Sequence, residues 1–314
     1  MSALVQGRIS DTNLSLNARG GTEQMRDRLL RVVNKDLLSK VVIHFSRVRP
    51  ENMKEGIPNI FYAHDLVGDP ESQILTNGGY KKFAKIVFVS YWQRDQYMLA
   101  YGIPYSHCTV IENAIEKQFE PHKRDLNTIN FIYHTTPHRG LQLLYPVFNA
   151  LCMQYDNIHL DVFSSFEVYG WKERDRAYEG LFDLLKQHPK ITYHGAKPNN
   201  EVLEALDKSH IFLYPCIWQE TSCIAMIEAI RSDVLVIHPN LAALPETASE
   251  CTIMYDYTED KQVHMNRAYR AANKVLSDPV FINDYANKSL RHLPRNSITT
   301  FEYKWNQLLE QITA

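Results

Sequence analysis

The sequence predicts an α/β protein with parallel sheets in two domains. Short β-branched or aromatic runs alternate with helical patterns along most of the chain, which is typical of parallel α/β architecture. The 314 residues correspond to two domains at about 150 residues each. A polar stretch at 116–128 interrupts the alternation and predicts a linker. We therefore expect an N-terminal domain at 1–122, a C-terminal domain at 123–294 and a final segment at 295–314.

The first domain is expected to be short. No convincing strand precedes the Gly20-Gly21 loop, because residues 3–9 (ALVQGRI) make a poor candidate. Helices are expected at Thr22–Asn34 and Trp92–Tyr101. Strands are expected at Lys40–Phe45, Ile57–His64, Lys85–Ser90 and Cys108–Asn113.

The second domain shows the alternation more clearly and predicts a doubly wound sheet, whose ligands should bind at the carboxyl ends of its strands. Its expected strands are Ile129–His134, Ile158–Ser165, Ile191–Gly195, Ile211–Cys216 and Val234–Pro239. Its expected helices are Leu141–Tyr155, Trp171–Gln187, Asn200–Lys208, Thr221–Ile230 and His264–Leu276. One more helix is expected at Thr299–Ile312, after Pro294.

Composition excludes several classes of protein. A formal net charge of -2 argues against wholesale binding to nucleic acid or acidic membranes. The sequence contains no run of 18 apolar residues, so no membrane helix is predicted. The N-terminus lacks the pattern of a signal peptide. The five cysteines are an odd number without metal-type spacing. We expect a cytoplasmic protein, with attachment to a membrane surface left open.

Two glutamates mark the first candidate site, in the stretch QETSCIAMIEAI at 219–230. Glu220 is expected at a strand-to-helix turn, where the next amides would be free donors for a hydroxyl-rich or anionic ligand, at Thr221, Ser222 and Cys223. Glu228 follows eight positions later, which is about 80° around a helix, so both carboxylates could face one cleft. The plain alternative is that Glu220 caps the helix and that Glu228 faces solvent. The apolar neighbours of Glu228 favour the functional interpretation, because a charge among them needs a partner.

The second candidate site is the loop in YHTTPHRGLQLL, at 133–144. Gly140 would let the backbone approach a ligand, and Arg139 could hold a phosphate with its fork of donors. The alternative for Arg139 is a solvated surface arginine. His134 and His138 are four apart, but the proline between them argues against a zinc pair on one helix face.

Two weaker signals lie in the first domain. Gly20-Gly21 precede a helix and could present amides to a phosphate, although a simple turn and cap explains them equally well. His64 ends an expected strand at the ligand edge, and its alternative is an ordinary loop histidine. Neither a G-x-G-x-x-G nor a Walker A pattern occurs, which disfavours a nicotinamide dehydrogenase.

In their order and spacing these segments resemble glycosyltransferase family 4, the large nucleotide-sugar-dependent retaining group of the GT-B fold. The resemblance implies two Rossmann-like doubly wound domains facing a cleft, with the last helix bracing the first domain, whose N-terminal part is shortened. The glutamate pair matches the family's E-x7-E motif, and Arg139 stands at the usual lysine of its phosphate loop. The matching segments are residues 20–23, 62–65, 89–116, 133–144, 193–206, 214–230 and 238–248.

The resemblance also implies roles for individual residues. Glu228 would hold the ribose hydroxyls, and Glu220 would hold hydroxyls of the transferred sugar, together with the amides after it. Arg139, helped by the Gly20-Gly21 loop, would stabilise the departing diphosphate, and His64 would orient the sugar near its anomeric carbon. Further donor-binding positions are His134, Gly140, Gly195, Lys197, Thr221, Ser222 and Cys223. His134 stands where the family usually has arginine, so a neutral imidazole would bind diphosphate more weakly or in a pH-dependent manner.

The implied reaction is the transfer of a sugar from a UDP- or GDP-sugar to a hydroxyl acceptor, with retention, no bound metal and no covalent nucleophile. The acceptor could be a glycan, a lipid, a protein or a nucleic acid. Three alternatives remain open on the sequence: a nucleotide-sugar epimerase of the same fold, a phosphorylase, and a catalytically lapsed subunit that binds nucleotide or glycan.

Overall fold

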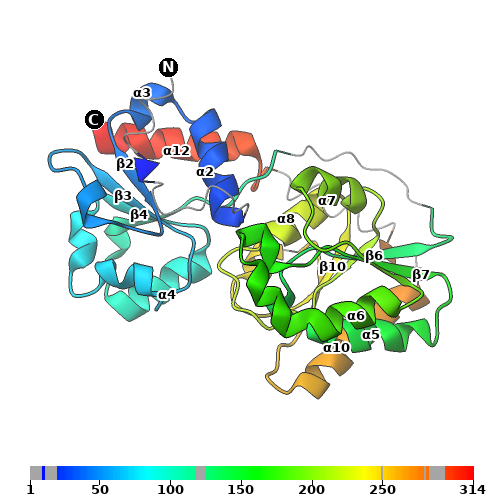
Figure 1. Ribbon diagram of the computed structural model, residues 1–314. Coiled ribbons are helices and arrows are strands. Elements are labelled where there is room, and N and C mark those ends of the chain that lie inside the picture. Colours follow the sequence, from blue (N-terminus) through cyan, green and yellow to red (C-terminus); the bar gives the residue numbers. More distant parts are fainter. Residues whose placement is uncertain (1–8, 11–19, 117–124, 249, 279–280, 283–293) are drawn as a thin grey trace. The chain divides into compact units, whose positions relative to one another are not determined.

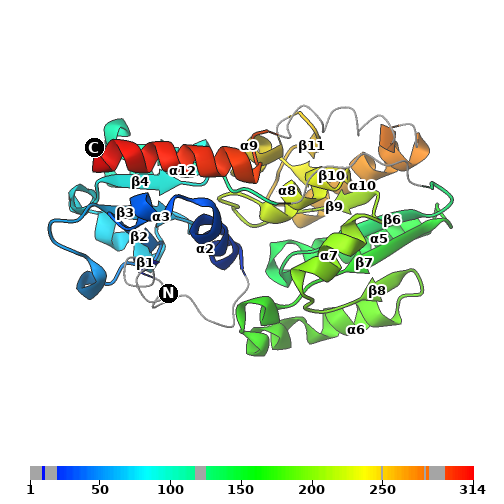
Figure 2. The same cartoon turned by 90° about the horizontal axis from the view of Figure 1, so that it is seen from above.

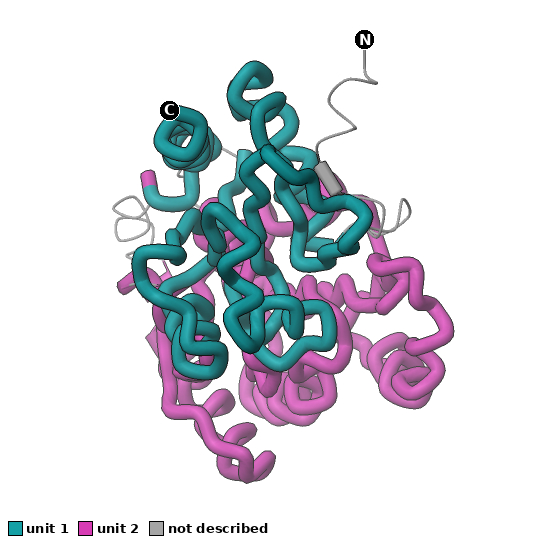
Figure 3. The backbone as a smooth tube through the Cα atoms, turned by 90° about the vertical axis from the view of Figure 1, so that its left-hand side faces the viewer, with its two compact units in different colours: residues 1–116, 220–222, 295–314 teal, residues 117–219, 223–294 magenta. Residues whose placement is uncertain are grey.

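The computed structural model describes residues 9–10, 20–116, 125–248, 250–278, 281–282 and 294–314 (Figure 1). The chain divides into two compact units, shown in separate colours in Figure 3. Unit 1 contains residues 1–116, 220–222 and 295–314, and unit 2 contains residues 117–219 and 223–294. Each unit has one parallel sheet with helices, so the expected α/β class is confirmed.

The sheet of unit 1 has five parallel strands in the order of the chain, β1-β2-β3-β4-β5. Their bounds are Ile9–Ser10, Val42–Phe45, Asn59–Ala63, Lys85–Phe88 and Cys108–Val110. The expectation that no strand precedes the Gly20-Gly21 loop is wrong, because Ile9 of β1 pairs with Ile43 of β2. A two-residue strand is too short to produce an alternating pattern, so sequence reading could not detect it.

Both faces of this sheet are covered by helices. Phe61 and Ala63 of β3 enter a buried cluster that includes Tyr97 of α4 (Tyr91–Tyr101). Tyr62 points to the opposite face, because strand side chains alternate, and its ring lies 5.0 Å from that of Trp305. Trp305 belongs to α12 (Ile298–Thr313), which packs against α2 (Gly21–Val32) and α3 (Lys35–Leu38) (Figure 1). Unit 1 therefore completes its core with the last helix of the chain.

The chain passes from unit 1 to unit 2 after Glu116 and returns before Arg295. The two crossing segments are hydrogen-bonded to each other within unit 1. The amide of Ile115 donates to the carbonyl oxygen of Asn296 at 3.1 Å, and the side chain of Asn296 donates to the carbonyl oxygen of Asn113 at 2.7 Å. The exit and the return of the chain are thus held side by side.

The sheet of unit 2 has six parallel strands in the order β11-β10-β9-β6-β7-β8 (Figure 2). The chain enters in the middle at β6, moves outward through β7 and β8, and then restarts beside β6 with β9. This reversal makes a switch point between β6 and β9. The strands are β6 Ile129–Tyr133, β7 Ile158–Val162, β8 Ile191–Tyr193, β9 Ile211–Leu213, β10 Leu235–Pro239 and β11 Ile253–Tyr255. The edge strand β11 was not expected from the sequence.

Helices cover both faces of this second sheet, with α5, α6 and α10 on one side and α7 and α8 on the other (Figure 1). Helix α5 buries Leu141, Leu144, Phe148 and Leu151, which share one face at helical spacing. The ring of Phe148 lies 5.5 Å from that of Phe131 in β6. The helices are α5 Leu141–Cys152, α6 Glu179–Gln187, α7 Asn199–Leu206, α8 Ile224–Arg231, α9 Leu244–Ala248 and α10 Lys261–Ser277.

The expected helix at Trp171–Gln187 is wrong in its first half. A 3₁₀ segment covers Lys172–Tyr178, and the α-helix begins only at Glu179. The carboxylate of Asp175 accepts hydrogen bonds from the Ser165 hydroxyl at 2.5 Å and the Phe166 amide at 2.8 Å. These bonds tie the segment to the loop after β7 and hold it out of the helical path. Other 3₁₀ segments lie at Pro50–Asn52, Pro70–Leu75, Gly79–Lys82, Tyr105–His107, Pro137–Arg139 and Phe166–Tyr169.

Candidate functional site

Two loops meet at the switch point of unit 2, residues 134–140 after β6 and residues 214–219 after β9. They approach backbone to backbone at Gly140, whose φ is 127°. A Cβ at this position would lie 2.2 Å from the carbonyl oxygen of Pro215. The amide of Ile217 also donates to the carbonyl oxygen of Arg139 at 3.3 Å. Gly140 was expected to let the backbone approach a ligand, and the approach that the structure records is to the neighbouring loop.

Arg139 lies at the end of the 3₁₀ turn Pro137–Arg139, immediately before α5. The residue is partly exposed. Its Nη2 lies 3.5 Å from the phenol oxygen of Tyr169, which belongs to the loop after β7. The structure therefore places this cation at the carboxyl edge of the sheet, among loops that follow β6, β7 and β9.

His134 directly follows β6 and points toward α8. Its Nε2 donates to the carbonyl oxygen of Ala225 at 3.0 Å, and its ring lies 4.6 Å from that of Phe212. Burial lowers the pKa of His134 to about 4, so the imidazole is neutral at physiological pH. The side chain ties the end of β6 to the helix after β9, and its Nε2 proton is used in that bond.

The expected helix Thr221–Ile230 begins three residues later than predicted, at Ile224. Cys223 takes the N-cap position with an extended backbone, so the angular argument that placed Glu220 on a helix does not apply. The physical reason lies in the contacts of residues 220–222, which belong to unit 1. The hydroxyl of Thr221 donates to the carbonyl oxygen of His64 at 2.8 Å, which holds this tripeptide away from the helical path.

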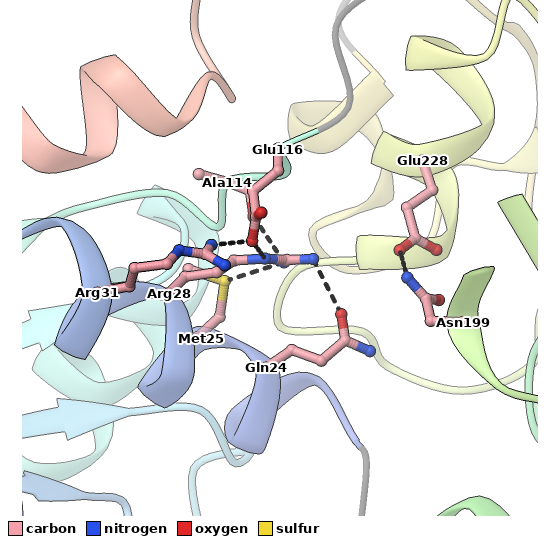
Figure 4. A network of polar contacts seen from close by, with 8 residues as sticks. All are labelled: Gln24, Met25, Arg28, Arg31, Ala114, Glu116, Asn199 and Glu228. Carbon is pink, nitrogen blue, oxygen red and sulfur yellow. Dashed lines mark hydrogen bonds and ion pairs between the residues drawn. The ribbon is translucent and has the colours of Figure 1, made fainter.

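Both glutamates of the first candidate site, Glu220 and Glu228, are buried, at 4% exposure each. Glu228 lies inside α8 and accepts a hydrogen bond at 3.2 Å from the side-chain amide of Asn199, the first residue of α7 (Figure 4). A solvent-facing Glu228 is therefore excluded. Sequence reasoning missed Asn199, because only contact across 29 positions shows which polar residue meets the carboxylate.

The loop between β8 and α7 contains Gly195 and Lys197. Gly195 has a φ of 69°, a conformation that favours glycine. Lys197 forms an ion pair with Glu201 at 3.3 Å on the surface of unit 2. This loop leads directly into α7, whose first residue binds Glu228, so the expected donor-binding positions Gly195 and Lys197 lie close in sequence to the partner of Glu228.

His64 directly follows β3 of unit 1, and both of its backbone polar groups are hydrogen-bonded. Its amide donates to the hydroxyl oxygen of Ser46 at 2.7 Å, and its carbonyl oxygen accepts from Thr221. The ring packs against Tyr62 with centroids 4.2 Å apart and against Phe45 at 6.2 Å. Burial lowers the pKa of His64 to about 3, so this histidine is also neutral. Ser46 gave no signal in the sequence.

Gly20 and Gly21 begin α2, with Gly20 at the N-cap position. The same helix carries Arg28, which the sequence analysis did not consider. Its guanidinium donates to the carbonyl oxygen of Ala114 at 2.7 Å and forms an ion pair with Glu116 at 3.6 Å (Figure 4). Arg28 therefore anchors the second half of α2 to the segment where the chain leaves unit 1.

Among the described residues, no helix has the length and apolar character needed to cross a membrane. In the same residues, no three side chains of histidine, cysteine, aspartate or glutamate are grouped so that they could hold a metal ion.

Solved structures share the fold at identities that establish the fold alone. A glycosyltransferase from Rickettsia africae has a TM-score of 0.68 and 14% identity, over 93% of this chain and 80% of that one. HepE from Anabaena in complex with UDP-glucose has a TM-score of 0.66 and 10% identity, over 90% and 82%. A mutant of S. aureus TarM, in complex with fondaparinux, alpha-GlcNAc-glycerol and UDP, has a TM-score of 0.65 and 13% identity, over 93% and 59%. A further TarM chain is spanned over 51% of its length.

The sequence itself matches none of the curated proteins. A family model does match, described as glycosyl transferases group 1, over residues 112–279. This segment is more than half of the chain and contains both loops of the switch point together with α8. At the level of this family model the resemblance to glycosyltransferases is confirmed: the chain belongs to the glycosyl transferases group 1 family.

Proposed function

We propose that this protein is a retaining glycosyltransferase that moves a sugar from a nucleoside diphosphate sugar to a hydroxyl acceptor. The observation that carries the proposal is the switch point of unit 2. Its two loops present a partly exposed arginine and lead into a helix with a buried, hydrogen-bonded glutamate. In open α/β sheets such a point is where nucleotides bind.

In this proposal unit 2 binds the donor. Glu228 holds the ribose hydroxyls, since a carboxylate offers two acceptor oxygens to vicinal donors. Asn199 holds the carboxylate from α7 by its 3.2 Å hydrogen bond, which fixes the direction in which Glu228 meets the ribose. Gly195 and Lys197, in the loop before α7, lie beside the base, and Arg139 lies beside the diphosphate.

The transfer step breaks the bond between the anomeric carbon and the diphosphate oxygen. A new bond then forms from the acceptor oxygen to the same face of that carbon. The acceptor proton passes to an oxygen of the leaving phosphate, so no side-chain nucleophile is required. Arg139 stabilises the charge that develops on the diphosphate, and preorganised charge of this kind is commonly a large contribution to catalysis.

Glu220 and His64 are assigned to the transferred sugar. Glu220 accepts hydrogen bonds from its hydroxyls, with the amides of the following residues as donors. His64 acts as a neutral imidazole, since burial lowers its pKa to about 3. It can therefore orient the sugar by hydrogen bonding but contributes no positive charge.

The first test is thermal stabilisation of the purified protein against a panel of nucleoside diphosphates and nucleotide sugars, with and without Mg²⁺. UDP-sugars come first in the panel because HepE, of similar fold, is in complex with UDP-glucose, and GDP-sugars follow. A ligand that binds only the folded protein raises its melting temperature. The expected result is a shift with nucleotides of one base, followed by sugar transfer or slow donor hydrolysis. No shift with any donor would favour the lapsed-subunit alternative.

A further inference from the structure

Ser46 follows β2 directly and adopts a backbone conformation that is rare for serine. Its φ is 57°, in the left-handed region. The amide of Arg47 donates to the carbonyl oxygen of Phe45, so Ser46 is the central residue of a three-residue γ-turn of the strained, positive-φ form. Glycine adopts this backbone with the least strain. A serine here, at 3% exposure, indicates that its hydroxyl is needed.

The hydroxyl of Ser46 is bonded to the loop after the neighbouring strand. Its oxygen accepts from the amide of His64 at 2.7 Å, and the same hydroxyl bonds to the carboxylate of Asp65. The amide of Ser46 donates to the carbonyl oxygen of Tyr62 at 2.8 Å. One buried side chain and its backbone thus reach three residues around the carboxyl end of β3.

Helix α4 holds the rest of that loop. The side-chain amide of Gln93 donates to the carbonyl oxygen of Asp65 at 2.8 Å, and the phenol of Tyr97 donates to that of Leu66 at 3.2 Å. Both side chains are buried. The amide of His64 has Ser46 as its hydrogen-bond partner, so the position of the histidine backbone depends on this hydroxyl.

We propose that Ser46 is a positioning residue for His64 in sugar transfer. The inference rests on the proposed function, because the position of His64 matters to catalysis only if the imidazole orients the sugar. A neutral imidazole acts through the direction of a hydrogen bond. A small displacement of its backbone therefore lowers turnover more than it lowers donor binding.

The test compares Ser46→Gly with Ser46→Ala, using UDP-glucose hydrolysis or transfer as the readout. Ser46→Gly removes the hydroxyl and relaxes the γ-turn. We expect its melting temperature to stay within about 3 °C of the wild type, while kcat falls roughly 10-fold or more with little change in KM. Ser46→Ala removes the hydroxyl and keeps the strained backbone, so we expect kcat and melting temperature both to fall.

Asn77→Gly is the matched control. Asn77 also has a positive φ, 52°, but lies in an exposed turn of unit 1, so its relaxation should leave kcat unchanged. His64→Ala sets the floor of activity. Wild-type turnover in Ser46→Gly, with turnover lost in His64→Ala, overturns the positioning role and leaves the proposed function standing. Wild-type turnover in His64→Ala overturns the role of His64 itself. No turnover of any donor by the wild type overturns the proposed function, and this inference with it.

Discussion

The two sheets differ in the way the chain visits their strands. In unit 2 the chain starts in the middle and reverses, so loops from β6 and β9, far apart in sequence, meet at one edge. In unit 1 the strands follow the order of the chain, and the loops that meet come from the consecutive strands β2 and β3.

The loops of the two units contact each other in different ways. In unit 2 they contact each other where a side chain is absent, because a Cβ at Gly140 would lie 2.2 Å from the carbonyl oxygen of Pro215. In unit 1 the contact depends on a side chain, because the Ser46 hydroxyl oxygen accepts a hydrogen bond from the His64 amide. Unit 1 also borrows its last helix from the far end of the chain. The difference teaches that a close approach of loops can depend on a missing side chain in one unit and on a buried hydroxyl in the other.

The largest expected effect tests the dependence of unit 1 on α12. Trp305→Ala removes a fully buried indole that contacts Tyr62, and we expect a loss of about 3–5 kcal/mol in the opening free energy of unit 1. Amide hydrogen exchange measures this on β3, with β6 of unit 2 as the internal reference. Tyr303→Ala, on the same helix but 60% exposed, is the matched control and should change little. An equal loss of protection on β6 would mean that the units open together.

The second prediction tests the switch point of unit 2. Gly140→Ala places a Cβ against a backbone carbonyl at a φ of 127°, and we expect unit 2 to lose about 3 kcal/mol. The measurement is hydrogen exchange on β6 or chemical denaturation read from unit 2. Gly180→Ala is the control, because nothing lies within 4 Å of a Cβ there and helix α6 should gain stability. Normal stability in Gly140→Ala would contradict the close approach of the loops.

The third prediction separates the two glutamates. Glu228→Ala should weaken donor affinity by about 10- to 100-fold, because one hydrogen bond to a charged group is worth about 1.5–3 kcal/mol. Glu220→Ala should mainly lower kcat. Asn199→Ala should give a smaller loss of affinity, since it removes only the residue that fixes Glu228. Calorimetry with the bound nucleotide and steady-state kinetics measure these effects. Wild-type values in both glutamate variants would refute the site assignment.

The smallest expected effect is a pH dependence. Burial lowers the pKa of His134 to about 4, so the unfolded chain, with an ordinary histidine, binds more protons between pH 6.5 and 4. The free energy of unfolding that His134 contributes is therefore fully present above pH 6.5, and it is lost as the pH falls toward 4. His134→Gln should lower the slope of stability against pH in that window, by up to about 1.4 kcal/mol per pH unit. An unchanged slope would mean that His134 is accessible to protons in the folded state.

Sequence reasoning predicted the elements that carry long periodic patterns. The strands Asn59–Ala63 and Ile129–Tyr133 and the helix Leu141–Cys152 lie within the ranges expected for them. It failed where a tertiary contact decides the local structure. Helix α8 begins late because Thr221 bonds to His64. The edge strand β1 has only two residues, and β11 has no fully buried residue, so neither produces a clear strand pattern.

The residues of the candidate site also fall into those that the sequence predicted and those that it missed. Glu220, Glu228 and Arg139 were predicted because charged residues beside apolar strands and helices stand out in the sequence. Asn199 and Ser46 were missed because each acts on a residue 29 or 18 positions away. The importance of Ser46 comes from a positive φ, which no feature of the residue itself indicates. Only the folded structure shows that Ser46, a residue with a hydroxyl, adopts a backbone conformation that favours glycine.

The paired crossing segments have a consequence for how the protein is made. Residues 117–219 and 223–294 form unit 2, while unit 1 needs residues 295–314 to cover Tyr62. During synthesis the ribosome therefore releases residues 20–116 of unit 1 before unit 2, and residues 295–314 after it. Unit 2 can fold while the earlier sheet still exposes an apolar face, since domains fold as units in order of emergence. In the order of the chain, most of unit 2 is inserted into unit 1. We therefore expect unit 1 to complete its core after unit 2 has folded.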